Sequence, residues 1–181
     1  MSPKIHFAAL ALLLALAAGC SGESDKPAPA PAAAAAVDPC GLVTLAEAEA
    51  ALGQAVLPPE TRKTNNPLGQ VICVYAATAE DKVRFVQLSL VRDQGMAPQM
   101  RQQGYSAARL FQDTKALLEN PQEVPGLGQA AFFGGSGLKA GAGLHVLQRD
   151  AYLTITVASS DGEHNLAQAK LLANKALERL K

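Results

Sequence analysis

Two histidines and an aspartate, His145, Asp150 and His164, are the residues whose types could support acid–base chemistry. His145 stands between Leu144 and Val146, so strand alternation places it on the opposite face from them, on a solvated or helix-covered surface. His164 falls in the first turn of an expected helix, which is a solvated position. No serine has the sequence context of a nucleophile elbow. We therefore expect no catalytic residue, and catalysis is the least favoured kind of function.

A glycine-rich stretch from Gly134 to Gly143 has some of the character of a phosphate-binding loop. It lacks the Gly-Lys-Ser/Thr ending, and it joins two expected strands where a phosphate loop joins a strand to a helix. The histidines also lack a zinc-like spacing to the cysteines. The sequence therefore predicts no bound nucleotide, no metal and no cofactor.

Cys20 ends the stretch Leu16-Ala17-Ala18-Gly19-Cys20, which resembles the lipobox of bacterial lipoproteins. The apolar run from Phe7 to Ala18 is shorter than the roughly 20 residues that cross a bilayer, and Lys4 precedes it. The resemblance implies a signal peptide at residues 1–19, cleavage before Cys20 and a diacylglyceryl thioether on its thiol. The alternative is an ordinary signal peptide that happens to end near a cysteine.

The lipobox resemblance also implies a location. Ser21, and not aspartate, follows the cysteine. In a host with two membranes, lipoprotein sorting then implies the outer membrane, with the protein facing the periplasm. We therefore expect the mature amino terminus to be anchored in a membrane by the lipid on Cys20.

Residues 20–37 form an expected linker between the anchor and a folded domain at residues 38–181. Pro27, Pro29 and Pro31 alternate with alanine and favour an extended polyproline II segment. Removal of Lys4 with the signal leaves 15 Lys and Arg against 16 Asp and Glu. A near-neutral protein has no broad positive field for nucleic acid, so we expect no nucleic-acid partner.

Cys40 and Cys73 remain once Cys20 is lipidated. Two cysteines in an oxidising compartment are typical of one disulfide, and the alternative is a pair of free buried thiols.

Periodicity predicts an α+β fold. A capping box at Thr44 and Glu47 begins a helix over residues 45–52, whose buried apolar stripe includes Leu45, and Gly53 ends it. Further helices are expected over residues 106–119, with an apolar stripe that includes Phe111 and Leu117, and from a second capping box, at 160–163, to the carboxyl terminus. Strands are expected at residues 71–77, 84–92, 130–133, 144–149 and 152–158, with a short edge strand around Val56. Residues 95–104 should be a loop with one helical turn. The expected architecture is an antiparallel sheet of about five strands packed against two or three helices.

From Asp38 onward the chain resembles a family of small secreted lipoproteins of unassigned function that are common in actinobacteria. The similar segments are Asp38-Pro39-Cys40-Gly41-Leu42, the helix that ends in Ala51-Leu52-Gly53, Cys73-Val74-Tyr75 and residues 124–132. The family usually has tryptophan where this chain has Tyr75, and often aspartate where it has Gln129. The resemblance implies a paired Cys40 and Cys73 and a helix-backed sheet, but no activity.

Three functions follow, in order of preference. The first is a membrane-anchored envelope lipoprotein whose non-catalytic domain binds a partner protein or a small ligand. The second is a periplasmic carrier or sensor of an apolar ligand, for which six aromatic residues are candidate pocket walls, although such residues more often fill a core. The third is a hydrolase. The six aromatics are Tyr75, Phe85, Phe111, Phe132, Phe133 and Tyr152.

Overall fold

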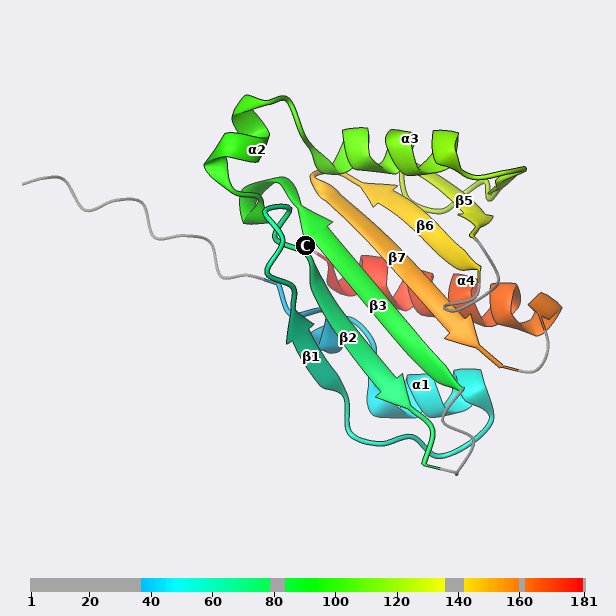
Figure 1. The fold of residues 1–181 in the computed structure, drawn as a ribbon. Helices are drawn as coiled ribbons and strands as arrows, with labels where there is room; N and C mark the ends of the chain where they lie inside the picture. Colours follow the sequence, from blue (N-terminus) through cyan, green and yellow to red (C-terminus); the bar gives the residue numbers. More distant parts are fainter. Residues whose placement is uncertain (1–36, 79–83, 136–141, 160–161, 181) are drawn as a thin grey trace, which may run out of the picture. The chain divides into compact units, whose positions relative to one another are not determined.

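The computed structural model describes residues 37–78, 84–135, 142–159 and 162–180. Within these residues the fold is α+β, with one antiparallel sheet in the order β1-β2-β3-β7-β6-β5-β4 (Figure 1). The strands are β1 (Glu60–Lys63), β2 (Val71–Ala76), β3 (Phe85–Arg92), β4 (Gln122–Glu123), β5 (Ala130–Gly134), β6 (Gly143–Gln148) and β7 (Ala151–Ala158). The α-helices are α1 (Leu45–Leu52), α2 (Pro98–Gln102), α3 (Ala107–Leu117) and α4 (Gly162–Arg179), with 3-10 turns η1 (Pro39–Gly41) and η2 (Asp93–Gly95).

The first face of the sheet holds the main core. In the central strands Leu88 lies between Cys73 on β2 and Ile155 on β7, and all three side chains are buried. Helices α1 and α4 pack on this face through small residues such as Ala48 and Ala173. Because side chains alternate along a strand, the intervening residues must point to the second face.

Helix α1 has the ends that its sequence predicts. Thr44 accepts a hydrogen bond from the Glu47 amide, and the Glu47 carboxylate accepts one from the Thr44 amide. Gly53 closes the helix in the left-handed conformation with φ +67°. Leu45, expected on the buried stripe, is instead 40% exposed.

The sheet has seven strands in the described residues, so the expectation of about five was too low. Strand β1 lies at Glu60–Lys63, whereas Val56 forms only an isolated bridge with Ala77. Strand β4 comprises Gln122 and Glu123 alone. Both are edge strands with exposed, polar side chains, so neither has the apolar alternation by which a strand is recognised.

Helix α3 covers the second face, on the opposite side of the sheet from α1 and α4 (Figure 1). Its stripe was correctly expected to include Phe111, which is buried, but Leu117 is 85% exposed. The expected helical turn within residues 95–104 is α2, which Pro98 begins. The described residues thus contain four α-helices, where two or three were expected.

A disulfide joins Cys40 in η1 to Cys73 in β2, as predicted. Close to it, the Tyr75 hydroxyl donates to the carbonyl oxygens of Cys40 and Val43. The amino-terminal turn is therefore bound to the sheet both covalently and through the Tyr75 side chain.

Several expected features lie outside the described residues. They are the signal peptide, Cys20, most of the linker, the turn at residues 80–82, residues 136–141 of the glycine-rich stretch, and the first two residues of the capping box at 160–163. Among the described helices, none is long and apolar enough to cross a membrane.

Candidate functional site

The second face of the sheet is only partly covered. Helix α3 packs over β6 and β7 at one end, where Phe111 contacts the Phe132 ring with centroids 4.9 Å apart. Over β2 and β3 the face carries half-buried side chains, both apolar and amide-bearing. These are Ile72, Val74, Phe85 and Gln87. We call this uncovered part the open face.

A pocket of about 230 Å³ lies where α3 meets the open face. Leu68, Val91 and Leu110 supply its apolar wall, and its polar lining consists of Gln70, Ser89, Thr114, Tyr152 and Thr154. The pocket therefore combines residues from three regions of the chain, the loop before β2, the central strands and α3.

Two hydroxyl residues on neighbouring strands belong to this pocket. Ser89 on β3 and Thr154 on β7 are directly opposite in the antiparallel register. The Gln70 side-chain amide donates to the Ser89 hydroxyl oxygen at 2.7 Å, and Asn66 donates to the Gln70 oxygen at 3.2 Å. Asn66 and Gln70 thus hold the Ser89 oxygen in place from the loop side.

His145 lies beside this pocket and under α3, and it is 9% exposed. Its ring stacks on Phe132 with centroids 4.5 Å apart, and its Nδ1 lies 2.6 Å from the Tyr152 hydroxyl. Burial lowers the pKa of His145 to about 4, opposed only by a hydrogen bond to the Gly134 carbonyl. Burial also raises the pKa of Tyr152. Both groups are therefore neutral near pH 7.

A neutral His145 carries one N–H group, and the ring hydrogen-bonds to the Gly134 backbone. The Nε2 side of the ring faces Gly143, which pairs with Gly134. Nδ1 lies 2.6 Å from the Tyr152 hydroxyl and 3.4 Å from the Thr154 hydroxyl. His145 is thus engaged on both sides of its ring within the fold.

The three residues weighed for acid–base chemistry have separate surroundings. Asp150 accepts hydrogen bonds from the Arg92 guanidinium at 2.9 and 3.2 Å, in the turn between β6 and β7. His145 is covered by α3, one of the two placements expected for it, and its described partners are Tyr152, Thr154 and Phe132. His164 is exposed in the first turn of α4, as predicted.

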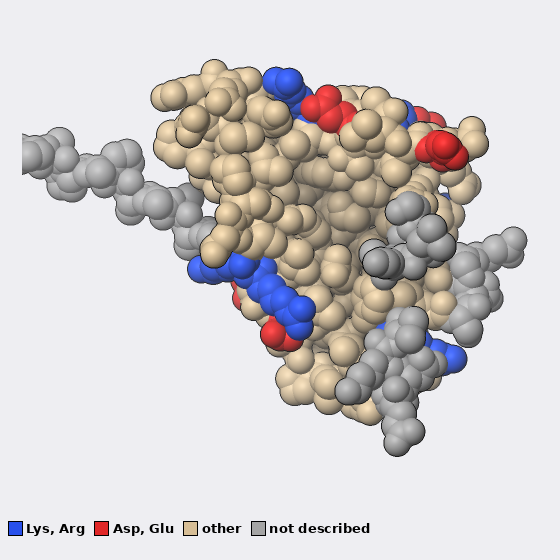
Figure 2. Space-filling model, viewed as in Figure 1, with Lys and Arg blue, Asp and Glu red and all other residues tan. Residues whose placement is uncertain are grey.

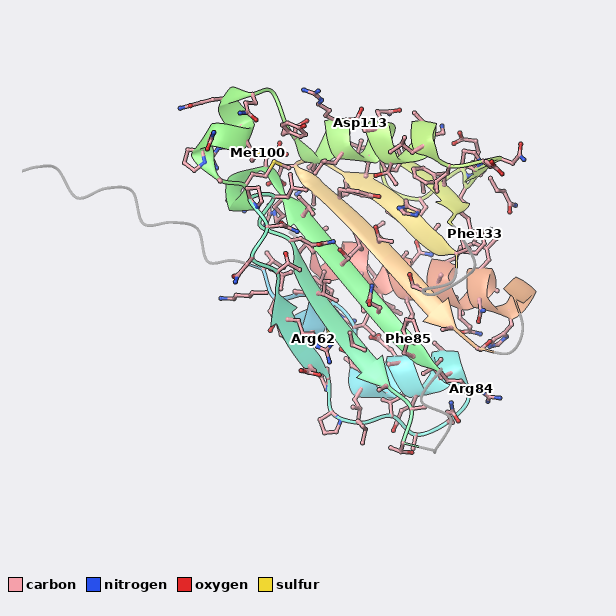
Figure 3. The ribbon with its side chains drawn as sticks, viewed as in Figure 1. Arg62, Arg84, Phe85, Met100, Asp113 and Phe133 are labelled. Atoms are coloured by element: carbon pink, nitrogen blue, oxygen red, sulfur yellow. A yellow bond between two sulfur atoms is a disulfide. The ribbon has the colours of Figure 1, made fainter. Side chains whose placement is uncertain are left out.

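The six aromatic residues do not form one pocket. Tyr75 is buried in the core of the first face. Phe111 and Phe132 pack together under α3, with Tyr152 edge-on to Phe111 at 5.9 Å. Of the six, Tyr152 is the one that lines the pocket. Figure 3 shows Phe85 at the far end of the open face and Phe133 at the β5 side of the sheet.

Charge is confined to the margins of this face. Figure 2 shows an uncharged, hollowed centre, with Lys and Arg beside Asp and Glu toward its edges. Arg62 and Glu60 on β1 pair at 2.7 Å on one margin, and Asp113 lies on the outer side of α3 on the other (Figure 3). No charged side chain lines the pocket itself.

Gln70, Ser89 and Thr154 were not among the expected site residues. A signal was present in the alternation of strand residues 84–92 and 152–158, whose second face carries Gln87, Ser89, Thr154 and Thr156. Such a polar face is typical of a solvated sheet surface, and only the packing of α3 makes part of it a cavity.

In the described ranges, no group of three or more His, Cys, Asp or Glu residues could hold a metal ion. Comparison of the chain with protein-family models, with curated proteins and with solved structures finds no match.

Proposed function

We propose that the protein is a membrane-anchored envelope lipoprotein whose folded domain acts by binding and not by catalysis. The lipobox-like segment ending at Cys20 supports the anchor, and the proline–alanine linker supports a domain held away from the lipid surface. The binding site in this proposal is the pocket between α3 and the sheet, together with the open face beside it.

The observation that carries the proposal is the pocket beneath α3. A concave site with an apolar wall and a few placed polar groups is the usual form of a ligand site. At about 230 Å³ it is smaller than most drug-sized sites, so its occupant should be small. A general acid or base is not needed for such a role, and His145, with both sides of its ring engaged, is poorly suited to one.

A protein partner is the second candidate, and the open face favours it. Ile72, Val74 and Phe85 are only half buried although they are apolar. A sheet face of this kind, uncharged in its centre, could pack against another protein. An apolar-ligand carrier is less favoured, because the pocket has more polar than apolar lining residues.

The anchor is tested by the intact mass of the protein extracted from membranes. A mature chain that begins at Cys20 and carries a diacylglyceryl group is expected. A chain that begins elsewhere, or an unmodified Cys20, would overturn this part of the proposal.

Binding is tested on protein purified from its own envelope, by native mass spectrometry and by site-specific photocrosslinking. A photoreactive residue at Gln87 reports on the open face, and the same residue at Leu171, which is 60% exposed on α4, is the matched control. A released small molecule supports the ligand candidate, whereas crosslinks from position 87 alone support the protein candidate. The absence of both a bound ligand and a position-specific crosslink would contradict the proposed binding role.

A further inference from the structure

The pocket beneath α3 has a polar floor with a definite hydrogen-bonding character. Ser89 and Thr154 sit side by side there, because they are opposite each other on β3 and β7. What these hydroxyls can offer to a ligand depends on which of their protons and lone pairs the fold already uses.

The hydroxyl of Ser89 is still able to donate a hydrogen bond. Its oxygen accepts from the Gln70 amide at 2.7 Å, and the described contacts give its hydroxyl no acceptor. The Thr154 oxygen lies 3.4 Å from His145 Nδ1, and the Thr154 hydroxyl hydrogen-bonds to the Tyr152 oxygen. Ser89 is therefore the floor hydroxyl whose proton can be donated into the pocket.

The other hydroxyls of the lining are hydrogen-bonded within the fold. Thr114 donates to the Leu110 carbonyl at 2.7 Å, and Tyr152 hydrogen-bonds to His145. The pocket thus offers one donor at its floor, the Ser89 hydroxyl, and a ligand must supply the acceptor.

Charge selects among possible acceptors. No cationic side chain lines the pocket, so a buried carboxylate or phosphate would lose its hydration without a counter-charge. The wall of Leu68, Val91 and Leu110 suits an apolar remainder in the ligand. A neutral oxygen, as in a carboxamide or a ketone, meets both conditions.

We infer that this pocket binds a small uncharged molecule that directs a carbonyl-type oxygen to the Ser89 hydroxyl and its apolar part to Leu68, Val91 and Leu110. The inference rests on the proposed binding function and names the class of ligand.

The test uses two isosteric probes, cyclohexanecarboxamide and cyclohexanecarboxylate, titrated into the exported, disulfide-bonded protein at pH 7. The dissociation constants come from two-dimensional ¹H–¹⁵N NMR shifts, which also locate the binding. The carboxamide should bind at least about tenfold more tightly than the carboxylate, with shifts centred on residues 89 and 154.

Substitutions test whether the preference for the carboxamide depends on the hydroxyl at the floor of the pocket. Ser89→Ala should weaken carboxamide binding about fivefold, the usual effect of one neutral hydrogen bond. Leu171→Ala, at an exposed position of α4 away from this face, should bind like the wild type. A thermal midpoint for each variant confirms that it is folded.

Three outcomes overturn the inference. They are equal binding of the two probes, binding that Ser89→Ala leaves unchanged, and no binding of either probe. Probe shifts confined to Val74, Phe85 and Gln87 would overturn the inference but leave the proposed binding function standing. The proposed function itself fails only if the envelope-purified protein also lacks a ligand and a crosslinked partner at this face.

Discussion

Arg179, near the end of α4, binds the Glu47 carboxylate of α1 through two hydrogen bonds of 2.7 Å each. The same arginine donates to the Leu42 carbonyl at 2.9 Å. These contacts join the last helix of the domain to the start of its first helix. The Arg179 guanidinium lowers the pKa of Glu47 to about 2, and the Thr44 amide contributes to this shift.

The Glu47 shift predicts acid sensitivity between about pH 4.5 and pH 2. Because the folded-state pKa lies below the ordinary value, the stabilisation is complete above pH 4.5 and is lost as the pH falls through this window. Glu47→Gln should lower the free energy of unfolding by about 1–2 kcal/mol at pH 7, after allowance for solvent screening, and by little at pH 2. Urea unfolding at both pH values measures the difference. Glu60→Gln, in an exposed pair, is the control, and an equal loss for Glu60→Gln would contradict the prediction.

The lowered pKa of His145 predicts a second loss of folding stability, at a higher pH than the loss due to Glu47. Its folded-state pKa of about 4 lies below the unfolded value of 6.5, so the unfolded chain takes up a proton first as the pH falls. Stability should decline from about pH 6.5 to pH 4, by roughly 3 kcal/mol in all. Equilibrium unfolding across this range should show the decline in the wild type and in His164→Ala, but not in His145→Asn. A decline that persists in His145→Asn would assign the effect to other groups.

Two glycines in the turn before β5 form a matched pair for testing close packing. Both have positive φ, +78° at Gly126 and +59° at Gly128. A methyl group at Gly126 would meet nothing within 4 Å, whereas at Gly128 it would lie 2.6 Å from the Leu147 carbonyl oxygen. Gly126→Ala should cost about 1 kcal/mol, from backbone strain alone. Gly128→Ala should cost about 2–4 kcal/mol because overpacking is added. Chemical unfolding of the two variants tests this, and equal losses would show that the turn relaxes.

The disulfide predicts a large effect of its removal. The two cysteines are separated by 33 positions in the sequence. In the chain-entropy view, loss of a bridge over a loop of this length costs about 2–5 kcal/mol. Cys40→Ser and Cys73→Ser should lower the unfolding free energy by similar amounts, and the double variant by no more than either. Additive losses in the double variant would mean that the thiols act separately, and peptide mapping without reductant checks the pairing directly.

Local signals in the sequence were sufficient for most of the helices and central strands. The capping box at Thr44 and Glu47 lies within four residues, so α1 could be predicted together with its ends. The alternation of residues 152–158 likewise predicted β7. The edge strand expected around Val56 was misplaced, and β4 was missed. Residues of both edge strands are polar and exposed, and β-pairing alone defines these strands.

The candidate site depends on long-range packing that the sequence does not encode locally. Ser89 and Thr154 are far apart in the chain, and they become neighbours only through the pairing of β3 with β7. The periodicity of α3 showed an apolar stripe but not which face of the sheet would receive it. His145 therefore had two possible surroundings in the sequence, and the contact of Phe111 with Phe132 decides between them.

The position of the disulfide also determines how the domain would bear a mechanical load. In a chain held by its amino terminus, a pull reaches the domain through residues 37–40, where Cys40 is bonded to Cys73 of β2. The force then passes across a covalent bond into β2, which is paired on both edges, with β1 and β3. The 32 residues between the two cysteines, including α1, are shielded from stretching, so the part of the fold that joins the tether is also the part least able to be peeled away.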